Sequence, residues 1–221
     1  MKNISVAIDG PAGAGKTTIA GILSKDLNLT KIDTGAMYRC VALKSINNNV
    51  PISDEEKIIE IARNCKIEFI GEEVFLDDVN VTKEIRSKEV TDIVSPLSSI
   101  VEVRHILVKQ QQEMAKGKNV IMEGRDITTV VLPSASVKIY LDANEDVRAK
   151  RRYDEVKDKN NDITYEEILE NIRKRDYNDM HKKEGSLIRT PDAIYIDSSN
   201  MTLDEVVNKI KDIIGSEAHE S

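Results

Sequence analysis

The chain begins with a short apolar run, a glycine-rich loop and a helical pattern that follow one another directly. Residues 4–8 read ISVAI, residues 10–17 read GPAGAGKT, and residues 18–27 read TIAGILSKDL. The loop matches the pattern G-x-x-x-x-G-K-[ST], in which backbone N–H groups at a helix N-terminus surround a phosphate group. We therefore predict a strand, a phosphate-binding loop and a helix, in this order.

Each polar group of the predicted loop has an expected role. The glycines permit positive φ and a close approach of the backbone to phosphate. Lys16 should reach the β and γ oxygens of a nucleoside triphosphate, and the Thr17 hydroxyl should face Mg²⁺. The alternative is a tight turn without a ligand. The residues assigned to the nucleotide are Gly10, Pro11, Ala12, Gly13, Ala14, Gly15, Lys16, Thr17 and Thr18.

Composition narrows the class of protein. Hydrophobic residues make up 40% of the 221 positions and charged residues 32%, which is typical of a globular protein. No apolar run reaches the roughly 18 residues of a membrane-spanning helix, and the first residues lack a signal-peptide core. The net charge of −7 argues against nucleic-acid binding. Cys40 and Cys65 show no metal-ligand spacing, so we expect reduced thiols in a cytoplasmic protein.

Apolar runs alternate with helical patterns along the chain, which predicts an α/β fold with a parallel sheet covered on both faces. Residues 66–90 instead contain short alternating runs split by Gly71-Glu72 and Asp77-Asp78, which predicts a small antiparallel meander. We expect a frayed polar tail over 215–221. The predicted strands are 4–8, 30–32, 119–122, 137–141 and 193–196. The predicted helices are 16–27, 36–47, 54–63, 98–116, 144–157, 164–181 and 202–214.

Two polar clusters follow predicted strands. The first cluster, DTGAMYR at 33–39, contains the Thr34 hydroxyl, the Tyr38 ring and the Arg39 guanidinium. A guanidinium can bind phosphate through two hydrogen bonds. The second, MEGRD at 122–126, supplies Arg125 and Asp126 at the strand end, where ligands bind in open α/β sheets. The alternatives are a capped helix with a surface arginine and a surface Arg–Asp pair.

Two predicted helices carry charged residues on one face each. Arg148, Arg151 and Arg152 have helical spacing, and so do Arg175, Asp179 and Lys182. A solvated charged helix is the usual explanation of such spacing. The polar stretch 154–163 between them suits a mobile lid, whose cations could offset charge on a transferred phosphoryl group.

These motifs together resemble the bacterial cytidylate kinase family of nucleoside monophosphate kinases. GPAGAGKT, DTGAMYR, the meander, EGRD, VKIYLDA and RDYND occur in the family's order, and the resemblance covers about residues 3–214. It implies a P-loop kinase core with a five-stranded parallel sheet flanked by helices. The implied parts are a core of residues 1–35, 98–147 and 183–221, a monophosphate-binding domain of residues 36–97 with a small antiparallel sheet, and a short lid with flanking helices of residues 148–182.

The resemblance also implies transfer of the ATP γ-phosphoryl group to CMP or dCMP with Mg²⁺, in pyrimidine nucleotide metabolism, by a monomer. Similar enzymes bind the acceptor phosphate with residues that match Arg39 and Arg125. They bind the pentose with residues that match Ser95, Arg175 and Asp179, and the base with residues that match Thr34, Arg104, Asp126 and Lys182. Tyr38 joins the substrate site. Thr17 and Asp33 are the expected metal contacts. Lys16, Arg39, Arg125, Arg148, Arg151, Arg152 and Arg175 are the expected catalytic residues.

The base chemistry fits this assignment, although the motif departs from the family at two places. A carboxylate such as Asp126 can accept from the exocyclic amine of cytosine, whereas uracil presents a carbonyl there and should bind worse. Lys182 stands where arginine is usual, and Gly185-Ser186-Leu187 stands where S-P-L is usual. Lysine lacks the guanidinium fork, so selectivity against UMP could be looser.

Other functions remain open on the sequence alone. A P-loop kinase of UMP or of a small metabolite, of the shikimate or gluconate type, would share the loop. A GTPase would need N-K-x-D, but the segment at Asn208-Lys209 lacks the aspartate at the required place. A nucleotide-binding regulator would explain the loop but not the arginine clusters.

Overall fold

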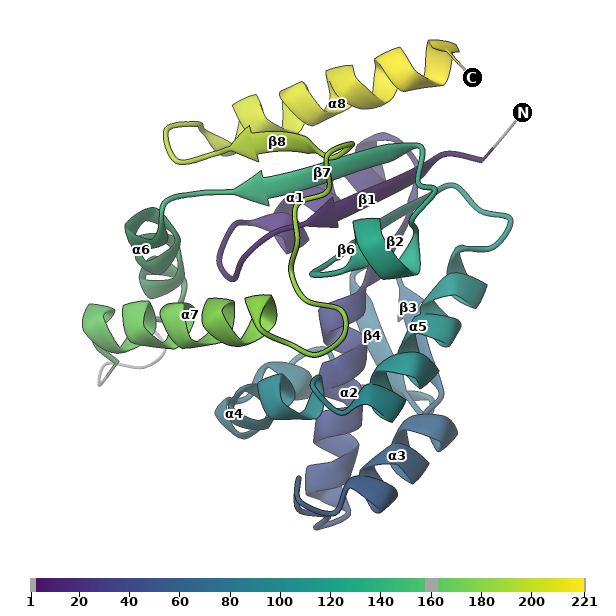
Figure 1. The fold of residues 1–221 in the computed structure, drawn as a ribbon, viewed down its shortest axis with the longest axis vertical. Helices are drawn as coiled ribbons and strands as arrows, with labels where there is room; N and C mark the ends of the chain where they lie inside the picture. The colour runs from purple at the N-terminus through teal and green to yellow at the C-terminus, as the bar shows by residue number, and fades with distance from the viewer. Residues whose placement is uncertain (1–2, 158–162, 221) are drawn as a thin grey trace.

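A computed structural model describes residues 3–157 and 163–220, and its centre is a parallel sheet of five strands (Figure 1). The strand order is β2-β6-β1-β7-β8, and every neighbouring pair is parallel. This arrangement confirms the predicted fold class. The strands are β1 (Ser5–Asp9), β2 (Thr30–Asp33), β6 (Val120–Gly124), β7 (Val137–Asp142) and β8 (Ile194–Asp197).

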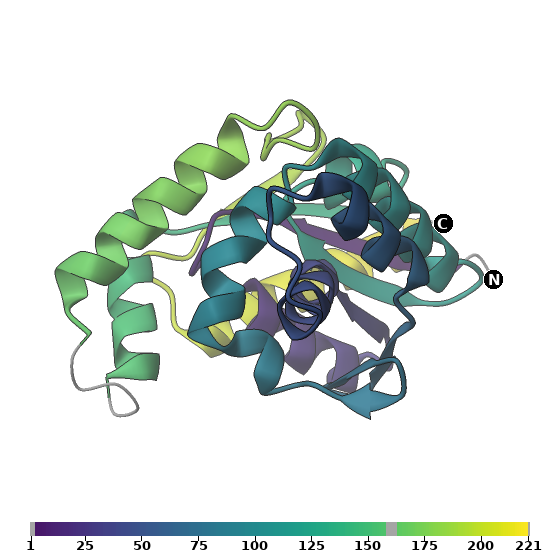
Figure 2. The same cartoon turned by 90° about the horizontal axis from the view of Figure 1, so that it is seen from below.

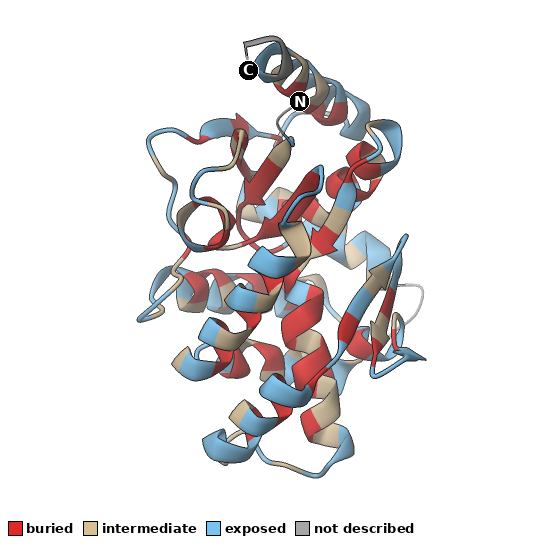
Figure 3. Ribbon diagram, turned by 90° about the vertical axis from the view of Figure 1, so that its right-hand side faces the viewer, coloured by how far each residue is buried: buried red, intermediate tan, exposed pale blue. Residues whose placement is uncertain are grey.

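Helices cover both faces of this sheet, which explains why its strands are apolar at successive positions. In β1, Val6 and Ile8 pack on one face with α1 (Lys16–Asp26) and α8 (Leu203–Glu220). Ala7 points to the other face, toward α2 (Thr34–Asn47) and α5 (Val101–Ala115). Figure 3 shows buried residues on the strands and on the inward sides of the helices.

The parallel register brings the carboxyl ends of the strands to one edge of the sheet. Asp9 pairs with Gly124 of β6 and with Tyr140 of β7, and Asp33 pairs with Glu123. The loops that follow β1, β2 and β6 therefore meet at this edge, as the polar clusters of the sequence require.

A second group of elements packs below the sheet in Figure 1. It contains α2, α5, α3 (Glu55–Asn64), α4 (Lys88–Leu97) and the 3₁₀ turn Glu84–Arg86. The predicted meander is confirmed as the antiparallel strands β3 (Ile67–Ile70), β4 (Glu73–Leu76) and β5 (Val79–Asn80). At its first turn, Glu72 pairs with Lys31 of β2 at 2.7 Å.

Helices α6 (Glu145–Val156) and α7 (Tyr165–Met180) stand together at the side where the strands end (Figures 1 and 2). A capping box between Thr164 and Glu167 begins α7. The stretch 154–163 predicted as a lid is only partly described. Residues 154–156 end α6, and residues 158–162 lie outside the described residues.

Four local features differ from what the sequence predicted. Helix α4 was not predicted, and α5 begins at Val101 rather than at residue 98. A π-helical turn, Ile127–Val131, follows the second polar cluster. The tail predicted to fray continues α8 to Glu220, because residues such as Glu217 have good helix propensity and a polar sequence does not prevent backbone hydrogen bonds. Among the described residues, no helix combines the length and the apolar character that a bilayer crossing requires.

Asp9, the last residue of β1, holds the π-helical turn in place. Its Oδ1 accepts from the Ile127 N–H at 2.9 Å, and its Oδ2 accepts from the Thr128 N–H at 2.8 Å and from the Thr128 hydroxyl at 2.6 Å. Burial raises the pKa of the Asp9 carboxyl, while these hydrogen bonds and the charge of Lys16 work in the opposite direction. The turn after Asp126 is thus fixed to the strand that leads into the glycine loop.

Replacing Asp9 with asparagine should lower the free energy of unfolding by about 2 kcal/mol, because one carbonyl oxygen cannot accept all three hydrogen bonds and a buried N–H group loses its acceptor. Urea denaturation measures the change. Asp192→Asn is the control, since Asp192 makes an exposed ion pair with Lys138. Equal effects of the two substitutions would show that the buried hydrogen bonds do not hold the turn.

Candidate active site

A cavity of about 1120 Å³ runs along the carboxyl edge of the sheet. Its walls come from the glycine loop and α1, from the start of α2, from the 123–126 turn, and from α4, α6 and α7. The small sheet, the 3₁₀ turn Glu84–Arg86, Arg104 of α5 and the start of α8 with the segment before it complete the walls. Every site residue predicted from the sequence lines this cavity except Gly10, Pro11 and Arg148. The structure therefore brings motifs from distant parts of the chain into one space.

The glycine loop exposes the N-terminus of α1, which begins at Lys16. Gly15 precedes it with φ of 90°, and no side chain among the described residues caps this N-terminus. Lys16 Nζ donates to the carbonyl oxygens of Gly10 and Pro11, each at 2.7 Å. Burial lowers the pKa of Lys16 to about 7, and the positive charge of Arg125 adds to this effect. An anion bound here would raise this pKa again, because its negative charge favours the protonated amine.

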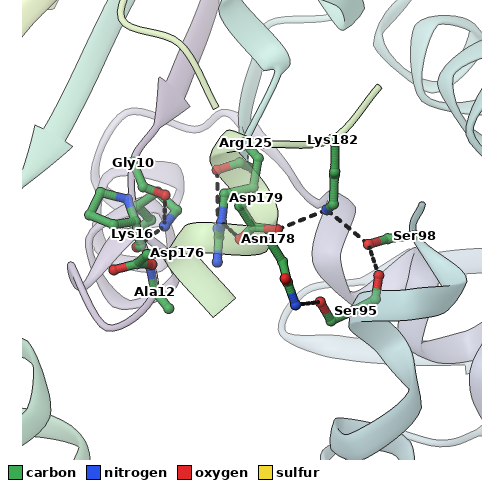
Figure 4. A network of polar contacts seen from close by, with 12 residues as sticks. Gly10, Ala12, Lys16, Ser95, Ser98, Arg125, Asp176, Asn178, Asp179 and Lys182 are labelled. Carbon is green, nitrogen blue, oxygen red and sulfur yellow. Dashed lines mark hydrogen bonds and ion pairs between the residues drawn. The ribbon is translucent and has the colours of Figure 1, made fainter. Parts of the chain in front are cut away.

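An ion pair from α6 and α7 holds the backbone of Ala12. Asp176 Oδ1 accepts from the Ala12 N–H at 2.9 Å, and Arg148 Nη1 donates to the Ala12 carbonyl at 2.8 Å (the Asp176 contact is drawn in Figure 4). Arg148 and Asp176 are both buried and pair with each other at 2.5 Å. Arg148 Nε also donates to the Ala143 carbonyl. Arg148 therefore faces the loop backbone rather than the cavity.

Oxygen atoms gather beside Thr17. The Thr17 hydroxyl donates to Glu123 Oε1 at 2.5 Å, and Asp33 lies on the neighbouring strand end, where its side chain caps α2. Glu123 is buried, and burial raises the pKa of its carboxyl, as does the charge of Asp33, whereas Lys16 lowers it. A hydroxyl and two carboxylates are the donor type that Mg²⁺ takes beside phosphate oxygens.

Cationic side chains face one another across the middle of the cavity. Burial, together with the positive charge of Arg175, lowers the pKa of Arg39 to about 10. Burial also lowers the pKa of Arg175, with Arg125 as the next cause. Arg39 donates to the Ile85 carbonyl and to the Thr91 hydroxyl, which fixes its direction. Such mutual repulsion around an open space is typical of an anion site.

A buried polar pocket lies at one end of the cavity. Arg104 pairs with Asp126, and only 4% and 6% of these residues are exposed. Arg104 also donates to the Ser98 carbonyl at 3.1 Å. The Tyr38 hydroxyl is buried without a partner among the described residues, and its ring lies beside Arg104. Thr34 donates to the Glu123 carbonyl at 2.8 Å.

Asp179 connects this pocket to the arginines. It accepts from Arg125 Nε at 2.7 Å and from Lys182 Nζ at 2.8 Å, and Lys182 also donates to Ser98 (Figure 4). Burial raises the pKa of Asp179, but the charges of Arg125 and Lys182 outweigh it and hold the pKa well below its usual range. Ser95 lies within 3.4 Å of the Asn178 amide.

Comparison with known proteins decides the family. A sequence model described as cytidylate kinase matches residues 6–216. A curated cytidylate kinase of Caldanaerobacter subterraneus is 50% identical over 211 residues, which cover 96% of this chain and 94% of that protein. The chain belongs to the cytidylate kinase family. A second relative, the cytidylate kinase of Caldicellulosiruptor bescii, is 49% identical and covers 96% of both chains.

A solved structure supports the same fold. A gluconokinase of Sinorhizobium meliloti aligns with a TM-score of 0.51 at 10% identity, covering 98% of this chain and 94% of that one. At this identity the likeness concerns the fold alone. The resemblance to the cytidylate kinase family that the motifs indicate is confirmed by the sequence relatives.

Sequence reasoning missed several residues of this cytidylate kinase family member. Glu123 was visible in the EGRD motif as an acid at a strand end. Asp176 was visible beside Arg175, and Arg86 lines the cavity with its guanidinium 4.0 Å from Asp33. The segment after β8 carried no signal, yet Ser198 receives hydrogen bonds from Arg151. Arg152 pairs with Glu155 at the cavity.

Replacing Asp176 with alanine should lower the free energy of unfolding by about 3–5 kcal/mol, because it leaves the buried charge of Arg148 without its partner. It should also speed hydrogen exchange at the Ala12 amide, which loses its acceptor. Chemical denaturation and exchange measured by mass spectrometry test both effects.

The matched control is Glu145→Gln. Glu145 and Arg173 also join α6 to α7, but on the surface, where a pair contributes less than about 1 kcal/mol. A loss at Asp176 as small as the loss at Glu145 would contradict the role assigned to the buried pair.

Proposed function

We propose that this protein transfers the γ-phosphoryl group of ATP to CMP or dCMP, giving ADP and CDP or dCDP. The observation that carries the proposal is one cavity with a phosphate-binding loop and the buried Arg104–Asp126 pair on its walls, in a chain of the cytidylate kinase family. A kinase of a small metabolite would not need a pocket that recognises a base.

The donor nucleotide would bind at the glycine loop. Lys16 would exchange its two carbonyl contacts for oxygens of the β- and γ-phosphates, and the open N–H groups of α1 would bind the same oxygens. Thr17 and Glu123, with Asp33 directly or through water, would hold Mg²⁺. When bound, the ion neutralises charge on the phosphate oxygens.

The acceptor phosphate would bind between Arg39 and Arg125. Its attacking oxygen is already largely deprotonated at neutral pH, so the transfer needs no strong general base. Catalysis would come from alignment of the two phosphates and from positive charge around the transferred group. Arg152 and Arg175 would supply this charge; both line the cavity, and both charges act on Arg39. Arg151 would contact the donor nucleotide near Ser198.

The acceptor base would bind against Asp126 and Arg104. Asp126 would accept from the exocyclic amine of cytosine, and Arg104 would donate to the ring acceptors. Thr34, Tyr38 and Lys182 complete this pocket. Ser95, Arg175 and Asp179 would face the pentose. Burial raises the pKa of Asp126, while the charge of Arg104 favours the ionised form that accepts hydrogen bonds.

The domain division belongs to the same proposal. Residues 1–35, 98–147 and 183–221 would form the core, residues 36–97 the monophosphate-binding domain and residues 148–182 the lid with its flanking helices. We further place the reaction in pyrimidine nucleotide metabolism in the cytoplasm and the protein in a monomeric state. The two cysteines, both buried free thiols, agree with a reducing compartment.

An assay of ADP release with ATP and different acceptors tests the function. We expect turnover with CMP and dCMP and little with UMP, AMP, shikimate or gluconate. Lys16→Met should lower kcat by about 100-fold or more, because it removes positive charge from the transition state. The control is Lys118→Met, an exposed lysine before β6 at the opposite edge of the sheet. Release of ADP that needs no acceptor, or that only gluconate or shikimate stimulates, would refute the proposal.

Replacing Asp126 with alanine should lower the ratio of kcat/KM for CMP to kcat/KM for UMP by about 100-fold or more, because the cytosine amine loses its acceptor. Asp126→Asn is the matched variant: its amide can donate to the uracil carbonyl, so UMP should gain relative to CMP. Steady-state kinetics with both acceptors give the ratios. An unchanged ratio in both variants would mean that Asp126 does not contact the base.

A further inference from the structure

We propose that Ser98 is a positioning residue of the acceptor site: its hydroxyl directs the ammonium of Lys182, so that one N–H group of this lysine faces the acceptor nucleotide. This inference rests on the proposed function, because it concerns the acceptor side of that reaction. Ser98 caps the C-terminus of α4, is only 7% exposed and lines the cavity.

The hydroxyl of Ser98 is held by the backbone of its own helix. It donates to the Ser95 carbonyl at 2.8 Å. Its only hydrogen is thereby used, so the oxygen can act toward other groups as an acceptor alone. Lys182 Nζ donates to this oxygen at 2.9 Å (Figure 4). Helix α4 therefore determines where the lysine finds its acceptor.

Lys182 needs two such acceptors because an ammonium has no plane of its own. Its three N–H groups rotate at the end of a flexible chain, whereas a guanidinium presents its donors in a fixed fork. Asp179 Oδ1 accepts one N–H group at 2.8 Å. This hydrogen bond alone would leave the ammonium free to turn about the line that joins the two atoms. The second hydrogen bond, to Ser98, removes that freedom.

The third N–H group of Lys182 is left for a ligand. Among the described residues, Ser98 and Asp179 are the acceptors of its hydrogen bonds, and Lys182 lines the cavity. Because the ammonium is tetrahedral, fixing two N–H groups also fixes the direction of the third. Cytosine offers a ring nitrogen and a carbonyl oxygen that accept hydrogen bonds from such a donor. Ser98 thus makes a flexible lysine a directional donor.

The test is Ser98→Ala, with Ser99→Ala as the matched control. Both substitutions remove a hydroxyl that donates to the Ser95 carbonyl, at 2.8 Å from Ser98 and at 3.3 Å from Ser99. Only the Ser98 hydroxyl also contacts Lys182, and Ser99 is exposed. The Ser98 carbonyl, which accepts from Arg104 at 3.1 Å, remains in both variants. The comparison therefore isolates the contact with the ammonium.

We expect Ser98→Ala to raise the KM for CMP about tenfold, the usual effect of losing one hydrogen bond to a charged group. The kcat and the KM for ATP should change less than about twofold. The reason is that no hydrogen bond among the described residues joins Ser98 to Lys16, Arg39 or Arg125. Ser99→Ala should leave all three values unchanged. Steady-state kinetics with CMP and ATP measure them.

A second background separates this contact from general damage. Lys182→Met removes the ammonium, so Ser98→Ala should raise the KM for CMP by less than about twofold further in that background. Ser98→Cys keeps the size of the side chain but offers only a weak acceptor, and it should reproduce the loss. This variant carries the test if Ser98→Ala does not fold.

Three results would each overturn the inference alone. They are equal KM values for CMP in the two serine variants, an equal rise in the KM for ATP, and the same added loss in the Lys182→Met background. A wild-type protein without CMP-dependent ADP release would overturn the proposed function, and this inference with it.

Discussion

The buried ion pair between Arg148 and Asp176 determines the shape of the loop on which the active site depends. It satisfies both backbone polar groups of Ala12, the N–H and the carbonyl, from helices α6 and α7, which follow the loop by more than a hundred residues in the chain. A loop with this many glycines has a large conformational entropy to lose, and its own sequence cannot fix it. Helices α6 and α7, which also carry Arg151, Arg152 and Arg175, thus impose the conformation of the glycine loop. One contact therefore positions both the loop and these arginines.

Positive and negative charges are paired in one part of the cavity and not in another. On the side of Asp126 and Asp179, each carboxylate has a cationic partner. In the middle of the cavity, Arg39 and Arg175 have only neutral partners or none among the described hydrogen bonds, and their pKa values are lowered. The first region is organised before a ligand arrives, as recognition of a base requires. The second stores repulsion that bound phosphate groups would relieve, which would favour binding of the two proposed polyanionic nucleotides together.

Much of the fold could be predicted because its strands are buried on both faces and therefore read as short apolar runs. Helix α4 was missed although its apolar residues have helical spacing, because its β-branched residues and Pro96 have low helix propensity. The turn after Asp126 was missed because its hydrogen bonds come from Asp9, far away in the sequence. The site residues could be proposed from motifs, but the motifs do not predict where each side chain points. The spacing of Arg148, Arg151 and Arg152 predicts that they share one helix face. It does not predict that, of the three, only Arg148 contacts the loop backbone.

Asp9 has a consequence for the size of the acceptor. The glycine loop starts directly after it, and its carboxylate holds the turn that directly follows Asp126. One residue therefore sets the separation between the loop proposed to bind the donor phosphates and the carboxylate proposed to meet the acceptor base. The glycine loop and the turn after Asp126 are both attached to β1, the central strand of the sheet. This separation would therefore stay the same whichever acceptor nucleotide binds. A purine monophosphate has a larger ring system and could bind only by displacing side chains of the pocket. A pyrimidine monophosphate would not need to displace them.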